Sequence, residues 1–172
     1  ILIYYSGHGF KDFEAETAYW QPVDAKQNKP SSWIAEHELK SQLKAIKAKH
    51  VLVIADSCFS GSLLRGVEVI NNKKLTKEAI LTRNLEKKIR IAFTSGGEEP
   101  VLDSGGGKHS VFAKSFLEVL NSIKDPTEGR YIYKKVIEKL VYNVEQQPEY
   151  NPILGTGGER GGDFIFVPKV IH

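Results

Sequence analysis

The sequence lacks several features that would assign its class at once. It has one cysteine, no methionine and no run of about 18 apolar residues that could form a transmembrane helix. A single cysteine cannot close a disulfide within the chain, so we expect a reducing compartment, a cytoplasmic protein and no membrane partner. The chain also begins within an apolar segment and without a signal-peptide pattern, from which we expect it to be part of a longer protein.

Charge and motif patterns exclude further classes of function. The net charge is only +3 and the lysines are dispersed, so we expect no nucleic-acid partner. The five histidines show no zinc-ligand spacing, and we expect no metal site and no cofactor. The chain has no P-loop, no dinucleotide-binding glycine motif and no G-x-S-x-G elbow. What remains is an ordinary globular composition, and 172 residues suffice for one domain with its own core.

Two short apolar segments each end in a turn with a reactive side chain. Residues 51–55 are five apolar residues, three of them β-branched, and Asp56, Ser57 and Cys58 follow them. Residues 1–5 form a second such segment, followed by a turn that contains His8. Continuous apolar runs of this length are typical of parallel strands that are buried on both faces. Because parallel strands present their carboxyl ends at one sheet edge, we expect His8 and Cys58 to meet there, as a cysteine nucleophile and its base require.

The two turn motifs resemble those of a known peptidase family. Tyr5-Ser-Gly-His-Gly9 and Asp56-Ser-Cys-Phe-Ser-Gly61 are similar to the paired motifs of caspase-like peptidases, closest to metacaspases and their bacterial relatives. His8 precedes Cys58 by 50 residues, a separation known for caspases. The resemblance implies an α/β fold, a caspase-like three-layer sandwich with a mostly parallel sheet flanked by helices. The family's first two strands and first helix have no counterpart here, so we expect an N-terminal segment or a second chain to complete the fold.

The resemblance also implies a mechanism and roles for the site residues. Cys58 would be the nucleophile, His8 the general base and acid, and the backbone N–H groups of Gly9 and Cys58 the oxyanion hole. A protein substrate follows from this chemistry. A lone cysteine is otherwise more often a small buried apolar residue, and a histidine more often a surface or capping residue. We apply the second interpretation to the other histidines, which are His37, His50, His109 and His172.

Substrate preference depends on the acid before the nucleophile. In metacaspases the acidic residue two positions before the cysteine lines the pocket for the side chain preceding the cut and selects Arg or Lys. Asp56 occupies this position, although a carboxylate that only caps the following turn is the simpler interpretation. Glu99 falls near the position of a second acid of that pocket. Calcium activation is common among metacaspases, but no ligand set can be assigned here.

Three functional hypotheses remain open at this point. The first is a cysteine endopeptidase that cuts after basic residues. The second is a catalytically inactive caspase-like scaffold or interaction module, although such a protein has no need to keep both His8 and Cys58. The third is a separase-like or legumain-like enzyme of the same peptidase clan, because these enzymes share both motifs.

The remaining pattern predicts alternating helices, strands and loops. A polar excursion at 10–30, with a short extended piece at 19–24, precedes an amphipathic helix at 36–49. We expect a long exposed loop at about 66–88, in which 75–85 could form a short helix, and consider its lysines and arginines either self-cleavage sites or ordinary surface charges. The further expected elements are a strand at 89–94, a flexible loop at 103–109, a helix at 110–123 capped by Ser110, a helix at 132–145 and a last strand at 163–167 that closes the sheet.

Overall fold

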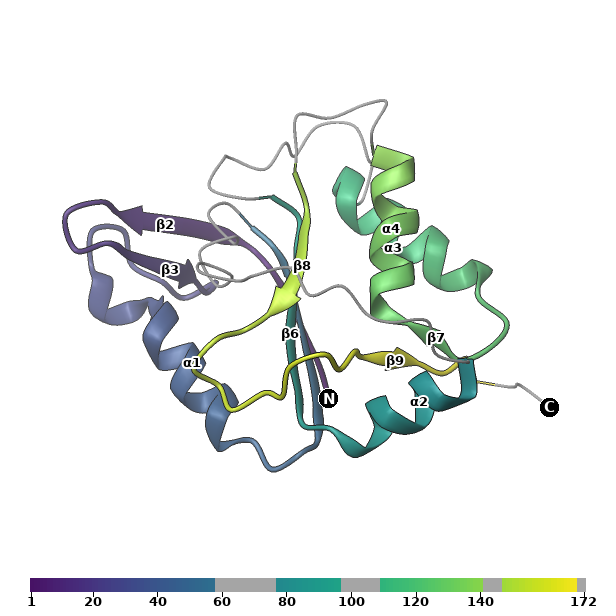
Figure 1. Cartoon of the computed structure of the whole chain (residues 1–172). Coiled ribbons are helices and arrows are strands. Elements are labelled where there is room, and N and C mark those ends of the chain that lie inside the picture. Colours follow the sequence, from purple (N-terminus) through teal and green to yellow (C-terminus); the bar gives the residue numbers. More distant parts are fainter. Residues whose placement is uncertain (58–76, 97–108, 141–146, 170–172) are drawn as a thin grey trace.

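A four-stranded sheet forms the centre of the structure (Figure 1). The computed structural model describes residues 1–57, 77–96, 109–140 and 147–169. The sheet order is β1-β5-β6-β8, with the first three strands parallel and β8 antiparallel to β6. These strands are Leu2–Ser6 (β1), His50–Asp56 (β5), Ile89–Thr94 (β6) and Glu149–Pro152 (β8).

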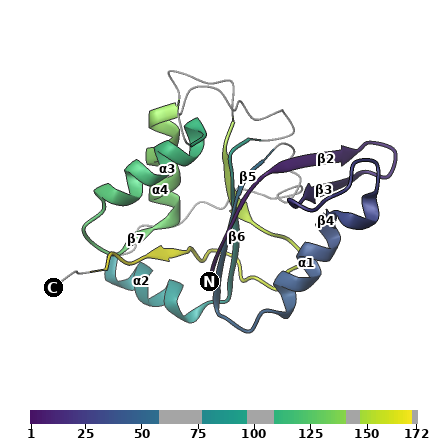
Figure 2. The same cartoon turned by 180° about the vertical axis from the view of Figure 1, so that it is seen from behind.

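Helices cover both faces of this sheet, with α1 on one side and α3 and α4 on the other (Figures 1 and 2). The helices are Glu36–Ala45 (α1), Lys77–Glu86 (α2), Val111–Ser122 (α3) and Gly129–Leu140 (α4), with a short 3-10 turn at Pro30–Ser32 (η1). The predicted α/β sandwich with a mostly parallel sheet is therefore confirmed. None of the helices in the described part of the chain is long and apolar enough to cross a bilayer.

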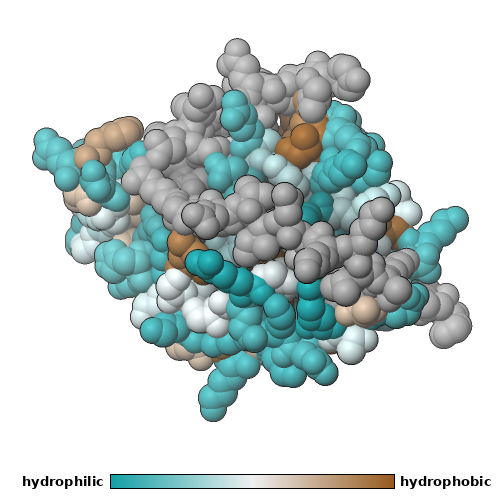
Figure 3. Space-filling model, in the orientation of Figure 1, coloured by the Kyte–Doolittle hydropathy of each residue, from teal (hydrophilic) through white to brown (hydrophobic). Residues whose placement is uncertain are grey.

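Strand β5 is buried on both faces, as its apolar run predicted. Leu52 and Ile54 pack into the core under α3 and α4, whereas Val51 and Val53 pack into the core under α1. Because successive side chains of a strand point to opposite faces, one apolar run supplies both cores. The surface is mainly hydrophilic in the view of Figure 3, with hydrophobic residues in small separate patches.

The helix starting at 111 follows the prediction closely, whereas the others differ at their ends. The Ser110 hydroxyl caps α3 by accepting a hydrogen bond from the Ala113 N–H at 2.9 Å. Helix α4 begins at Gly129, three residues before the predicted start, because the distant Asp163 carboxylate accepts the Arg130 N–H at 3.0 Å. Residues 141–146, which include its predicted end, lie outside the described residues.

The polar segment after His8 is not only a surface excursion, because it contains two strands. The predicted extended piece at 19–24 overlaps the second of them, and the first was not predicted. His8–Asp12 (β2) and Thr17–Gln21 (β3) pair antiparallel, and β3 also pairs with Ile34–Ala35 (β4). The Asp12 carboxylate closes the hairpin by accepting two backbone N–H groups of the turn, at 3.0 and 2.9 Å. Aspartate at a turn was the available sequence signal for this hairpin.

Two further predictions need correction. The strand at 163–167 was expected to close the main sheet, but β8 does so, while Ile165–Phe166 (β9) pairs with Thr127–Glu128 (β7) in a separate ribbon. Strand β8 is short and ends in a proline, which an edge strand tolerates but which weakens the sequence signal. The expected loop at 66–88 is helical over α2, which overlaps the alternative helix span of 75–85 and ends one residue later. Residues 66–76 and 103–108 lie outside the described residues.

A buried arginine ties β6 to the end of α1. The Arg90 side chain is 1% exposed, and its guanidinium donates four hydrogen bonds to backbone carbonyls. The acceptors are Leu43 (3.0 Å), Lys49 (3.0 Å), Ile89 (2.8 Å) and Ile46 (2.6 Å). Burial lowers the pKa of Arg90, but an arginine retains its charge in proteins. The carbonyl ends of α1 favour a cation, so the helix and the arginine stabilise each other.

Candidate active site

The register between β1 and β5 brings the two turn motifs to one edge of the sheet. The strands are parallel neighbours, and Ser6 lies opposite Asp56. His8 follows Ser6 by two residues, and Cys58 follows Asp56 by two residues. The predicted juxtaposition of these strands is confirmed. Cys58 lies outside the described residues, so its pairing with His8 stays a prediction.

His8 begins β2 and is exposed, with Gln21 of β3 as its partner across the hairpin. The Tyr5 hydroxyl approaches the His8 carbonyl oxygen at 2.7 Å and the Gln21 carbonyl oxygen at 3.1 Å, so its single proton is shared between them. The Tyr5 ring stacks parallel on Trp20, with ring centroids 4.2 Å apart. Tyr5 therefore links the backbone of His8 in β2 to the backbone of Gln21 in β3 and fixes the position of His8.

Gly7 allows this hydrogen bond. A Cβ at position 7 would lie 2.7 Å from the Tyr5 hydroxyl oxygen, closer than real Cβ contacts permit. In the sequence, Gly7 belongs to the turn motif Tyr5-Ser-Gly-His-Gly9, where glycine allows a tight turn. The structure adds a packing reason, because any side chain at this position would displace the hydroxyl from the His8 carbonyl.

Asp56 is a buried carboxylate, 5% exposed, at the end of β5. Its Oδ2 accepts hydrogen bonds from the Ser110 hydroxyl and from the Tyr4 hydroxyl, the latter at 3.4 Å. Its Oδ1 is buried and has no hydrogen-bond partner among the described residues. Burial and the negative charge of Asp56 raise the pKa of Tyr4. Ser110 was predicted only as a helix cap, because a contact between residues 54 positions apart leaves no local sequence signal.

Of the other two predicted site residues, the structure describes Gly9 but not Glu99. Gly9 lies in β2, half-buried and opposite Trp20, and the oxyanion role of its N–H stays a prediction. Glu99 lies outside the described residues, so its position relative to Asp56 is not tested. Among the residues that the structure describes, no group of three or more His, Cys, Asp or Glu side chains could hold a metal ion.

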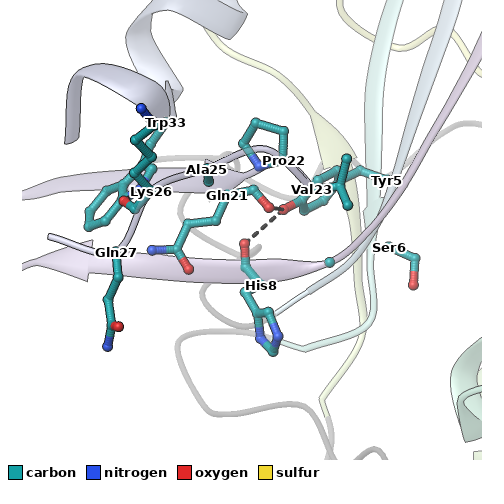
Figure 4. Close-up of a pocket in the computed structure, with 11 residues that line it drawn as sticks. Tyr5, Ser6, His8, Gln21, Pro22, Val23, Ala25, Lys26, Gln27 and Trp33 are labelled. Atoms are coloured by element: carbon teal, nitrogen blue, oxygen red, sulfur yellow. Dashed lines mark hydrogen bonds between the residues drawn. The ribbon is translucent and has the colours of Figure 1, made fainter. Parts of the chain in front are cut away.

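A pocket of about 490 Å³ adjoins His8. It is bounded by the end of β1, by the facing ends of β2 and β3 and by the segment that leads to β4 (Figure 4). Sequence reasoning missed this pocket, because its walls come from a hairpin that was not predicted. Among its lining residues are Tyr5, His8, Gln21, Pro22, Val23 and Trp33.

Tyr5, which lines the pocket, and Tyr4, which contacts the Asp56 carboxylate, point to opposite faces of the central sheet. Tyr5 packs with Trp20 in the core on the α1 side. Tyr4 points to the other face, where it reaches Asp56 beside the start of α3. His8 follows both tyrosines and begins β2, just past the carboxyl end of β1.

Comparison with known proteins gives one finding on the family. A search of curated proteins finds no match. The family model described as the caspase domain matches residues 1–154 and so includes both turn motifs. With the parallel sheet and the β1–β5 register, this match shows that the chain belongs to the caspase-domain family of cysteine peptidases.

Proposed function

We propose that this chain is an endopeptidase in which His8 and Cys58 form the catalytic dyad. The observation that carries the proposal is the β1–β5 register, in which Ser6 is paired with Asp56. His8 lies two residues after Ser6, and Cys58 lies two residues after Asp56. Adjacent strands lie about 4.8 Å apart, a separation that a histidine and a cysteine side chain can bridge. The family match supports a peptidase in general, and a peptidase acts on protein substrates.

The proposed reaction runs in two steps. The Cys58 thiolate attacks the carbonyl carbon, the C–N bond breaks, and protonated His8 gives its proton to the leaving amine. His8 then takes a proton from water, the resulting hydroxide attacks the thioester carbonyl, and the C–S bond breaks. The acid is released, and the Cys58 thiolate and protonated His8 are restored. The N–H groups of Gly9 and Cys58 would stabilise the oxyanion in both steps.

We further propose cleavage after arginine or lysine. Asp56 supports this specificity, because its buried Oδ1 has no hydrogen-bond partner among the described residues. An unsatisfied buried carboxylate oxygen is costly, and a guanidinium or ammonium donor satisfies it with opposite charge. Glu99 is proposed as a second acid of the same subsite.

A small fluorogenic peptide series tests both proposals. Substrates with Arg or Lys before the cut should exceed the Asp substrate by about 100-fold in kcat/KM, or about 2.7 kcal/mol. Cys58→Ala should abolish turnover, and His8→Ala should lower it by orders of magnitude. Equal cleavage after Asp would refute the acidic subsite. A folded protein that cleaves none of the series would favour the inactive scaffold.

We also propose that a strand from an N-terminal segment or a second chain pairs with β1. This strand lies at the edge of the four-stranded sheet, and Leu2 and Tyr4 are 47% and 46% exposed. An apolar edge strand of this kind is a template for pairing. A chain that is monomeric and melts cooperatively in isolation would contradict this. The single cysteine supports a cytoplasmic location, which stays a proposal.

A further inference from the structure

We propose that the pocket beside His8 binds the substrate residues that follow the scissile bond, and that it selects an aromatic or large aliphatic side chain there. This inference rests on the proposed peptidase function. It assigns a second specificity site, separate from the subsite at Asp56.

The chemistry of the leaving group fixes the direction of the substrate. The amine released by C–N cleavage takes its proton from His8, so the first residue after the cut must start beside that imidazole. The pocket adjoins the same residue. If Asp56 receives the side chain before the cut, the substrate crosses the sheet edge from the α3 face to the face where Tyr5 packs.

The lining of the pocket favours apolar side chains. Its volume of about 490 Å³ lies within the range of pockets that bind small ligands. Pro22, Val23 and Trp33 contribute apolar surface, and the Val23 side chain is fully exposed. The amides of Gln21 and Gln27 can hydrogen-bond a peptide backbone. Among the described residues that line the pocket none is acidic, so the basic preference proposed for Asp56 does not extend to them.

An aromatic surface continues from the pocket along the hairpin. Phe10 lies two residues after His8 in β2, and Tyr19 lies two residues before Gln21 in β3, so both share the face of the pocket residues. Trp33 contacts both rings, with centroid distances of 5.0 Å to Phe10 and 5.6 Å to Tyr19. Phe10 is 42% exposed although it belongs to this aromatic cluster. A substrate that extends past the cut would therefore meet further apolar surface.

A matched pair of internally quenched peptides tests the inference. Both carry arginine before the cut, and the first two residues after it are Phe-Phe in one peptide and Gly-Gly in the other. We expect kcat/KM for the Phe-Phe peptide to be at least about 10-fold higher. A ratio below about 2, in a protein that cleaves a fluorogenic Arg amide, would overturn the inference and leave the proposed function intact.

Two variants with the same chemical change locate the effect. Val23→Asp removes apolar surface from the pocket, and we expect it to lower the Phe-Phe to Gly-Gly ratio at least about fivefold. Val167→Asp makes the same change at a residue that is 69% exposed and outside the pocket lining, and it should keep the wild-type ratio. A Val23→Asp protein with the wild-type ratio would refute the assignment.

A binding measurement keeps the inference testable if neither peptide is cleaved. The probe is Phe-Phe-Gly amide, which mimics the released fragment, and the signal is tryptophan fluorescence, because Trp33 lines the pocket. Saturable binding that Val23→Asp weakens at least about fivefold supports the inference. No saturable change up to millimolar probe would overturn it.

Discussion

Replacing Arg90 by methionine should destabilise the protein strongly, although methionine is apolar and of similar length. The four backbone carbonyls that accept its hydrogen bonds remain when the guanidinium is removed. The bonds to Leu43 and Ile89 are buried, whereas those to Ile46 and Lys49 are only partly buried. In the variant, water can therefore hydrogen-bond the carbonyls of Ile46 and Lys49, but it cannot reach those of Leu43 and Ile89.

The two buried bonds set the magnitude of the effect. A buried acceptor left without a partner costs about 1–3 kcal/mol. Two of them give a loss of about 4 kcal/mol in the free energy of unfolding, a large part of the 5–15 kcal/mol typical of a domain. Replacing a buried charge by an apolar residue can leave the free energy of unfolding unchanged when the partner is replaced as well. The partners of Arg90 are main-chain carbonyls, which no substitution removes.

Urea denaturation followed by circular dichroism measures this loss. Lys44→Met serves as the control, because Lys44 is an exposed residue of α1, and it should change the free energy of unfolding by no more than about 0.5 kcal/mol. Arg90→Lys should lie between the two, since an ammonium cannot span four carbonyls in fixed directions. A loss below about 1 kcal/mol for Arg90→Met would refute the reasoning.

Three further predictions follow from the site and the fold. Tyr5→Phe keeps the stacked ring but frees the His8 carbonyl, so kcat should fall about 10-fold, or about 1.4 kcal/mol, with KM unchanged; equal kcat in steady-state assays would contradict this. Gly129→Ala places a Cβ 2.0 Å from the Tyr150 hydroxyl oxygen and should lower the free energy of unfolding, measured by urea denaturation, by about 3 kcal/mol. The loss should be smaller in a protein that also carries Tyr150→Phe; if the losses of the two single variants simply add in the double variant, the clash is refuted. Self-cleavage within 66–88 should fall after a basic residue outside α2, because proteases bind extended chain and not a helix. Mass spectrometry of the fragments, with Cys58→Ala as control, decides this; a cut within α2 would contradict it.

Local sequence patterns predicted the central elements of the fold well. The apolar runs of β5 and β6 and the cap at Ser110 each act through neighbouring residues, and the structure contains all three. Strand β8 and the β2–β3 hairpin were missed, because their stability comes from partners that are distant in sequence or from a turn residue that was not weighed.

The candidate site was predictable in its chain positions but not in its surroundings. The strand-and-turn motif around His8 indicated the sheet edge at which it lies. The hydrogen bonds of Asp56 to Tyr4 and Ser110 were not predictable, because they depend on how α3 packs against the sheet. The pocket beside His8 was also missed, because its walls join segments that only the folded β2–β3 hairpin brings together.

The β1–β5 register has a consequence for how this sequence can change in evolution. One residue inserted into β1 would exchange the faces of Tyr4 and Tyr5, so the partner of Asp56 and the clamp on His8 would be lost together. Two inserted residues would restore the faces but move His8 along the strand by about 6.6 Å, beyond hydrogen-bond reach of a residue at the end of β5. Insertions of one or two residues in β1 alone are therefore excluded, and length variation should be confined to the connections, such as the turn of the β2–β3 hairpin.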